Sequence, residues 1–214
     1  EIYTLSLHDA LPISSWERFI GGSLKSNGYI VYEHQGGKCF IIDPGYEGEK
    51  FLKRISELKL SLEGIILTHH HYDHIGGVAK IQSVNNCRVY IHRMDSERIK
   101  FKNLVLLESG TELTLETEKF KIIHTPGHTM GGICIYNEAN RTVFTGDTLF
   151  LDDIGRTDLA DGDGWLMRDT MVDIIDKWDN DIVIYPGHGD GGTMKKVREI
   201  NEEFKFALTL PKKS

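Results

Sequence analysis

The sequence predicts an α/β protein, and three observations support this fold class. Short apolar runs alternate with amphipathic segments from Trp16 onward, as expected where strands and helices alternate along the chain. Turns containing glycine or proline separate many of these runs. The 214 residues suit one domain, or one large two-layered unit, and can bury a substantial core.

The first half of the chain contains five segments with strand character and two with helical character. Segment 47–60 carries apolar residues at helical spacing, whereas 64–67 is a short apolar run typical of a buried strand. We expect strands at 18–24, 29–33, 38–42, 64–67 and 88–91, and helices at 47–60 and from Gly77 to about residue 84.

The second half continues the same alternation. It predicts strands with a polar turn within 104–123, a hairpin of 133–136 and 142–144, a helix at 165–178, a strand at 182–184 and an amphipathic helix at 194–206. The loop 151–164 holds five aspartates and is expected to be exposed. The sequence shows no internal repeat, low-complexity tract or clear linker.

The segment 68–74, with the sequence THHHYDH, is the strongest functional signal in the chain. It places four histidines and one aspartate in six consecutive positions, directly after the apolar run 64–67. Core packing does not require this grouping, whereas imidazole and carboxylate together suit a divalent metal of the zinc or iron class. A remnant of a histidine tag explains it poorly, because tags are longer, lie at termini and lack the following Asp-His pair.

Three later segments supply the same ligand types beside tight turns that contain glycine. They are 125–129 (TPGHT), 145–148 (TGDT) and 185–189 (YPGHG). Because each proposed ligand follows an apolar strand segment, we expect all of them at one edge of a sheet, on backbone that the sheet holds rigidly. The four segments together predict a two-metal hydrolase.

The spacing within the histidine-rich segment divides the ligands between two metals. His69 and His71 are two positions apart, so in an extended segment their side chains point the same way and can hold one metal with His128. Asp73 and His74 follow where the chain begins to turn into a helix, so their side chains diverge from the first pair.

Asp73 and His74 can hold a second metal together with His188. Asp147 offers two carboxylate oxygens and can bridge the two ions. Metals in such pairs lie about 3.5–4 Å apart and lower the pKa of bound water to near 7, which provides a nucleophile at neutral pH. The predicted ligands are His69, His71, Asp73, His74, His128, Asp147 and His188.

The other histidines and one aspartate near these segments are not predicted to bind a metal. His70 and Tyr72 occupy the alternate positions and are expected to face away, with two roles open for Tyr72, lining a pocket or packing. His124 is expected to be structural, and His34 and His92 have no motif around them. Asp43 ends a strand near the same edge, where it either hydrogen-bonds a ligating histidine or simply forms a turn.

Composition excludes several classes of protein. The formal net charge of -7 and the absence of a large basic cluster argue against nucleic-acid binding, and no apolar run approaches the length of a membrane span. The cysteines, Cys39, Cys87 and Cys134, lie singly in apolar stretches. Buried thiols in a reducing compartment are the expectation, and hence a cytoplasmic protein.

Residues 1–13 (EIYTLSLHDALPI) are interpreted as a sequencing-adapter artefact rather than native protein, and residues 14–214 as a single domain. The segment lacks the basic region and the long apolar stretch of a signal peptide. If it is an artefact, the native N-terminus is missing and a cleaved signal peptide stays open. The oligomeric state is also left open by the sequence.

The pattern His69-x-His71-x-Asp73-His74, with His128, Asp147 and His188, resembles the metallo-β-lactamase superfamily over nearly the whole chain after Trp16. The resemblance implies a four-layer αβ/βα sandwich, in which two mixed β-sheets lie face to face with helices outside. It also implies two divalent metal ions, with zinc expected and iron or manganese left open.

Within the superfamily, segments 146–150 (GDTLF) and 154–158 (IGRTD) resemble the short glyoxalase II-like hydrolases. That branch implies a small-molecule thioester substrate such as S-lactoylglutathione. The implied mechanism has a metal-bridging hydroxide attack the thioester carbonyl while Asp73 both ligates a metal and orients the nucleophile. The C-terminal helical domain that supplies basic residues for glutathione in long glyoxalase II enzymes is not expected here. Arg156 either contacts an anionic substrate or pairs with Asp153 or Asp158.

Other functions of the same scaffold are weighed against this one. A persulfide dioxygenase shares the Gly-Arg-Thr-Asp stretch but uses a single iron, which here would bind His69, His128 and Asp147. The presence of Asp73, His74 and His188 favours two metals over one. An aspartate at position 147 argues against a β-lactamase, the acidic short chain argues against a nuclease, and seven filled ligand positions argue against a non-catalytic binding protein.

Overall fold

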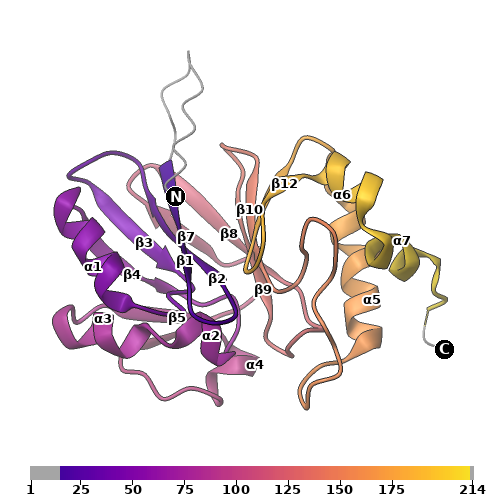
Figure 1. Cartoon of the computed structure of the whole chain (residues 1–214), viewed down its shortest axis with the longest axis horizontal. Coiled ribbons are helices and arrows are strands. Elements are labelled where there is room, and N and C mark those ends of the chain that lie inside the picture. The colour runs from indigo at the N-terminus through magenta and orange to yellow at the C-terminus, as the bar shows by residue number, and fades with distance from the viewer. Residues whose placement is uncertain (1–14, 213–214) are drawn as a thin grey trace.

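The computed structural model describes residues 15–212, which form two six-stranded sheets with helices on the outside (Figure 1). In spatial order, the first sheet contains β1 (Ser15–Gly21), β2 (Ser26–Tyr32), β3 (Lys38–Ile42), β4 (Ser61–Ile66), β5 (Arg88–His92) and β6 (Leu104–Leu107). The second contains β12 (Gly192–Thr193), β11 (Val183–Pro186), β10 (Thr142–Gly146), β9 (Ile133–Asn137), β8 (Glu118–His124) and β7 (Glu112–Leu115). Both sheets are mixed, because β3 to β6 run parallel beside the antiparallel β1 and β2, and β10 pairs in parallel with β11.

The helices are distributed along the chain in two groups. The first half contains α1 (Gly48–Glu57), α2 (Tyr72–Ile75), α3 (Val78–Val84) and α4 (Arg93–Ser96). The second half contains α5 (Gly164–Asp173), the 3-10 helix η1 (Ile175–Lys177), α6 (Met194–Ile200) and α7 (Glu202–Thr209). In Figure 1, α1 and α3 cover the outer face of the first sheet, and α5, α6 and α7 lie outside the second. The sequence reading missed the short helix α4, because one turn carries no amphipathic period.

Alternate residues of the central strands face different layers, which explains why these strands are apolar throughout. Ile41 of β3 and Ile65 of β4 pack with the buried residues of α1 and α3. Their neighbours Ile42 and Ile66 point to the opposite face and pack against the second sheet. A strand covered on both faces has no solvated side that would call for polar residues.

A separate apolar cluster joins the second sheet to its own helices. Val143 of β10 packs there with Met167 of α5 and Phe204 of α7. On the other face of β10, Phe144 lies in the core between the sheets, with its ring 5.0 Å from that of Tyr29 and 5.6 Å from that of Tyr185. The strand β10 is therefore held on both sides just before it delivers Asp147 to the edge of the sheet.

Two predicted helices are interrupted in the structure. The predicted helix 165–178 ends at Asp173 and continues as η1. The predicted helix 194–206 breaks at Asn201, whose ψ of 99° is not helical. The Asn201 side chain caps α7 by accepting from the Phe204 amide, and it donates to the carbonyls of Phe150 and Asp153. Asparagine favours such a cap over a helix interior.

The layers confirm the predicted four-layer αβ/βα sandwich of the α/β class. Within residues 15–212, no helix combines the length and the apolar character needed to cross a membrane. The interpretation of residues 1–13 as an artefact falls outside the described residues and stays a prediction.

Candidate metal centre

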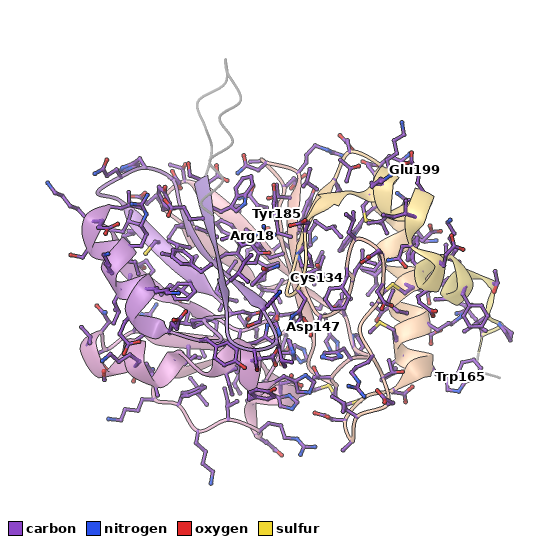
Figure 2. All side chains as sticks on the ribbon, viewed as in Figure 1. Arg18, Cys134, Asp147, Trp165, Tyr185 and Glu199 are labelled. Atoms are coloured by element: carbon purple, nitrogen blue, oxygen red, sulfur yellow. The ribbon has the colours of Figure 1, made fainter. Side chains whose placement is uncertain are left out.

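The four ligand-bearing segments meet at one end of the sandwich, between the two sheets. Each follows a strand: β4 leads to the histidine-rich segment, β8 to His128, β10 to Asp147 and β11 to His188. Asp147 lies at the junction between the halves of the molecule (Figure 2). Rigid strands thus bring together loops that are far apart in the sequence, which is the arrangement that the sequence predicts.

The first group of ligands consists of three histidines. One ring nitrogen each of His69, His71 and His128 lie within 4.8 Å of one another. The Nδ1 atom of His71 is 2.9 Å from Nε2 of His128. The ring of His69 stands nearly perpendicular to that of His71, with the centroids 4.8 Å apart. Three imidazoles that converge in this way match a typical zinc ligand set. We call these residues the first triad.

The second group combines one carboxylate with two imidazoles. Ligand atoms of Asp73, His74 and His188 also lie within 4.8 Å of one another. The Oδ2 atom of Asp73 is 3.1 Å from Nε2 of His188 and 3.5 Å from Nε2 of His74. We call these residues the second triad.

The Asp147 carboxylate lies between the two triads. Its Oδ1 atom is 3.3 Å from Nε2 of His74, and its Oδ2 atom is 3.6 Å from Nε2 of His128 and 3.5 Å from Nε2 of His188. It therefore faces one histidine of the first triad and two of the second. All seven predicted ligands converge, although their role as metal ligands stays a prediction.

The buried atoms of this centre fit a metal. The Nε2 atoms of His69 and His74 and the Oδ1 atom of Asp147 are buried, and among the described residues they form no hydrogen bond of acceptable geometry. Burying a polar atom without a partner is costly. A cation bound between these imidazole nitrogens and the carboxylate oxygen would give each of them a partner. The donor set is therefore suited to divalent metals.

Both aspartates of the centre are ionised at neutral pH. Burial acts to raise the pKa of Asp73, but the imidazoles of His188 and His74 beside it hold it well below its ordinary value. Burial likewise opposes ionisation of Asp147, whose pKa is nonetheless held far below its ordinary value by the charge of His74 and by the neighbouring imidazole of His188. An ionised carboxylate is the form that binds a metal.

The histidines of the two triads differ in their affinity for protons. Burial, reinforced by neighbouring histidines, lowers the pKa of His69 far below its ordinary value and that of His71 to about 4. Burial acts in the same direction on His74 and His188, but the carboxylates beside them raise the pKa of both, to about 9 for His188. His69 and His71 are therefore neutral at pH 7, whereas His74 and His188 bind protons more readily, and protons compete with cations for them.

Hydrogen bonds from outside the triads fix the orientation of the ligating rings. The Nδ1 atom of His128 donates to the carbonyl of Arg156 at 2.8 Å, and Nδ1 of His188 donates to the carbonyl of Leu24 at 3.1 Å. His69 has its Nδ1 atom 3.0 Å from the hydroxyl of Thr68. In each case the Nε2 atom is left directed at the centre, as metal-ligating histidines require.

Asp43 has both roles that the sequence left open. It directly follows β3 with a left-handed φ of 45°, and its carbonyl accepts from the Gly45 amide at 2.8 Å, which closes a tight three-residue turn. Its Oδ2 atom also lies 3.1 Å from Nδ1 of His74 and 2.5 Å from the hydroxyl of Thr68, and its Oδ1 atom accepts from the Thr68 amide at 2.7 Å. Asp43 thus orients a predicted ligand and holds the start of the histidine-rich segment.

The His188 loop of the second sheet is held by β2 of the first sheet, a contact that sequence reasoning missed. The Asn27 side chain donates to the carbonyls of Pro186 and Gly189, and the Tyr29 hydroxyl donates to Pro186 at 2.6 Å. The Asn27 amide also donates to the carbonyl of Gly187. These partners are about 160 positions apart and belong to no local motif.

Arg156, Tyr72 and His70 lie outside the two triads. Arg156 pairs through Nε and Nη2 with both oxygens of Asp158, at 2.7 Å each, which is one of the two roles left open for its side chain. Tyr72 is 63% exposed and is therefore not packed in the core. His70 points to Asp95 and Asp161 and away from the centre. The cysteines are buried and free, as predicted.

His92 lies outside the centre and supports a prediction about pH. It stacks on His124, with ring centroids 4.0 Å apart. Burial, and then the neighbouring His124, lower the pKa of His92 from 6.5 to about 4. In the unfolded chain His92 binds a proton near pH 6.5, whereas in the folded chain it binds one only near pH 4. Between these values the unfolded state binds more protons, so the folded state loses stability as the pH falls through this window.

We therefore expect His92→Gln to weaken the dependence of the free energy of unfolding on pH between 6.5 and 4. Urea denaturation of both proteins at several pH values within this window measures the difference. Parallel curves of unfolding free energy against pH for the two proteins would contradict the expectation.

The comparisons with known proteins agree with this geometry. The family model described as the metallo-beta-lactamase superfamily matches residues 21–188, a span that includes all seven predicted ligands. The chain belongs to this superfamily. The predicted resemblance is therefore confirmed.

Individual relatives are similar over most of the chain. A hydroxyacylglutathione hydrolase of Francisella tularensis subsp. novicida is 34% identical over 179 residues, which cover 83% of this chain and 68% of that protein. The crystal structure of BLEG-1 B3 metallo-beta-lactamase aligns with a TM-score of 0.78 at 29% identity, covering 91% of this chain and 100% of that one. The structure of TTHA1623 in a di-iron-bound form aligns with a TM-score of 0.74 at 28% identity, covering 86% and 98%. This set of relatives is consistent with a short glyoxalase II-like branch.

Proposed function

We propose that this protein is a dinuclear metal-dependent hydrolase of small thioesters that resemble S-lactoylglutathione. One observation carries the proposal: the Asp147 carboxylate lies 3.3–3.6 Å from histidines of both triads. A carboxylate with histidines on either side can bridge two cations. A site for a single metal would not require the ligands of the second triad. The similarity to a hydroxyacylglutathione hydrolase supports the thioester as substrate.

Zinc is the proposed metal. A site built from imidazoles and carboxylates suits zinc, and one that keeps an open position suits a catalytic zinc in particular. Iron is compatible with the same donors, and the similar structure of TTHA1623 was determined in a di-iron-bound form. Manganese is a third metal that accepts carboxylate ligands.

The residues of the centre have distinct roles in the proposed reaction. A bound metal pair supplies a Lewis acid for the thioester carbonyl and a water of lowered pKa as nucleophile. Asp73 is ionised and lies 3.1 Å from Nε2 of His188, so its carboxylate is fixed where it can accept a hydrogen bond and orient the attacking water. The leaving thiol has a pKa of about 8.5, so it can depart as a thiolate without a general acid.

The proposal is tested by following hydrolysis of S-lactoylglutathione by the zinc-loaded protein. We expect thiol release by the unmodified protein and at least a thousandfold slower release by His69→Ala, because the first triad loses one of its three imidazoles (roughly the scale of losing an essential catalytic group). His34→Ala is the matched control, since His34 lies on the surface and is hydrogen-bonded to the carbonyl of Gln35. It should retain full activity.

Oxygen consumption with glutathione persulfide distinguishes the rival oxidoreductase. A protein that binds a single iron, consumes oxygen with the persulfide and leaves S-lactoylglutathione intact would contradict the hydrolase proposal. The cytoplasmic location and the absence of nucleic-acid and membrane partners stay predictions.

A further inference from the structure

Asp95 is a buried carboxylate that the proposed mechanism does not use. It lies in the short helix α4, directly after β5, and is 1% exposed. Its Oδ2 atom accepts from the backbone amide of His70 at 3.1 Å and from the Thr129 hydroxyl at 2.9 Å, and lies 2.8 Å from Nδ1 of His70. Its Oδ1 atom accepts from the Gly131 amide at 2.6 Å. One side chain therefore engages four polar groups.

These four groups belong to the two loops that carry the first triad. His70 lies between His69 and His71, and Thr129 directly follows His128. The His70 loop lies 25 positions before Asp95 and the His128 loop 34 to 36 positions after it, and Asp95 connects them without contacting a predicted ligand itself. A Cβ at Gly131 would overlap the Asp95 carboxylate, so glycine is what permits this close approach.

Asp95 and Asp43 lie on opposite sides of β4, the strand that leads to the histidine-rich segment. In the first sheet β4 pairs with β3 on one side and with β5 on the other. Asp43 at the end of β3 holds Thr68 and His74, and Asp95 after β5 holds His70 and the His128 loop. Asp43 thus contacts His74 of the second triad and, through Thr68, adjoins His69 of the first. His70 and Thr129, which donate to Asp95, stand in the sequence next to ligands of the first triad alone.

We propose that Asp95 is the positioning residue of the first triad, and that it sets the metal affinity of that triad while leaving the second triad unaffected. The physical reason is that His69, His71 and His128 come from two separate loops, and the distance between those loops determines whether three imidazoles can meet one ion. Groups that orient ligands from outside typically change metal affinity by about 10–100-fold. The inference rests on the proposed dinuclear centre.

The test is the affinity of each site for Zn²⁺ in Asp95→Asn, measured by competition with a chromophoric chelator. Asparagine keeps the size of the side chain but replaces one acceptor oxygen with a donor NH₂, which faces N–H and O–H groups. We expect one of the two zinc ions to bind about 10–100-fold more weakly and the other to bind within about twofold of its normal affinity. Absorption spectra of the Co²⁺-substituted protein, compared with those of His71→Ala and His188→Ala, identify which site has changed.

Glu118→Gln is the matched control for loss of a buried carboxylate. Glu118 is 3% exposed and accepts from Asn137 at 2.7 Å in the second sheet, away from the ligand loops. The Glu118→Gln protein should bind both zinc ions with unchanged affinity, even where its free energy of unfolding is lower. Thr129→Val provides a second, milder variant in case Asp95→Asn does not fold, because it removes only one hydrogen bond at a fully buried position. It should weaken the same site by a smaller factor.

Each outcome decides a different claim. If Asp95→Asn and Thr129→Val leave both affinities unchanged, or weaken both sites equally, Asp95 has no selective positioning role while the proposed function stands. If the unmodified protein binds fewer than two zinc ions, the dinuclear proposal fails, and the selectivity of Asp95 fails with it.

Discussion

Asp147→Asn is expected to lower kcat/KM for S-lactoylglutathione by at least about a thousandfold while the circular dichroism spectrum stays unchanged. The Asp147 carboxylate lies within 3.6 Å of histidines from both triads. An amide of the same shape carries no charge and would direct N–H groups at one of the two cations, so the bridge is lost. The fold is retained because the size of the side chain and its surroundings are preserved.

Steady-state kinetics on the zinc-loaded variant measure this effect. Asp152→Asn is the control, since Asp152 is exposed and lies five positions away on the same loop. It should stay within about twofold of the unmodified protein, as most exposed substitutions do. An Asp147→Asn protein that kept more than a tenth of the activity would show that the carboxylate does not join the two metals.

Gly187→Ala is expected to lower activity by about a hundredfold without changing any ionisable group. An added Cβ would overlap Oδ1 of Asp147 and would lie 2.6 Å from Cε1 of His74. One methyl group would therefore displace the bridging carboxylate by an appreciable fraction of an ångström, together with the ring beside it. The zinc content of the purified variant should fall as well, because both triads lose their shared partner.

Gly189→Asn is the control that shows whether any substitution in the His188 turn lowers activity. Gly189 has a φ of +70°, which asparagine tolerates better than most residues, and a Cβ there meets no atom within 4 Å. We expect nearly full activity and two zinc ions per chain. Equal losses in Gly187→Ala and Gly189→Asn would mean that the turn, and not the space beside Asp147, limits the enzyme.

The convergence of the seven predicted ligands could be expected from the sequence because each of them is tied to a local pattern. His128, Asp147 and His188 each follow an apolar strand and stand beside a glycine, so their position at a sheet edge follows from the strand that precedes them. The division into two triads followed from the two-residue period of an extended segment and from the start of α2 at Tyr72.

The groups that support the ligands could not be predicted in the same way. Asp95 engages residues 25 to 36 positions away, and Asn27 engages residues about 160 positions away, so no local motif reveals either. Their partners are decided by which strands become neighbours in the folded sheets. Asn201 was missed for a related reason, since its break of the final helix depends on carbonyls of the distant loop at Phe150 and Asp153.

The most direct test is a titration of the metal-depleted protein with Zn²⁺, in which bound metal and hydrolysis of S-lactoylglutathione are measured on the same sample. A dinuclear centre predicts two tightly bound ions per chain and full hydrolysis only after the second has bound. Full activity with one ion per chain, or two bound ions with no hydrolysis of any thioester tested, would contradict the assignment.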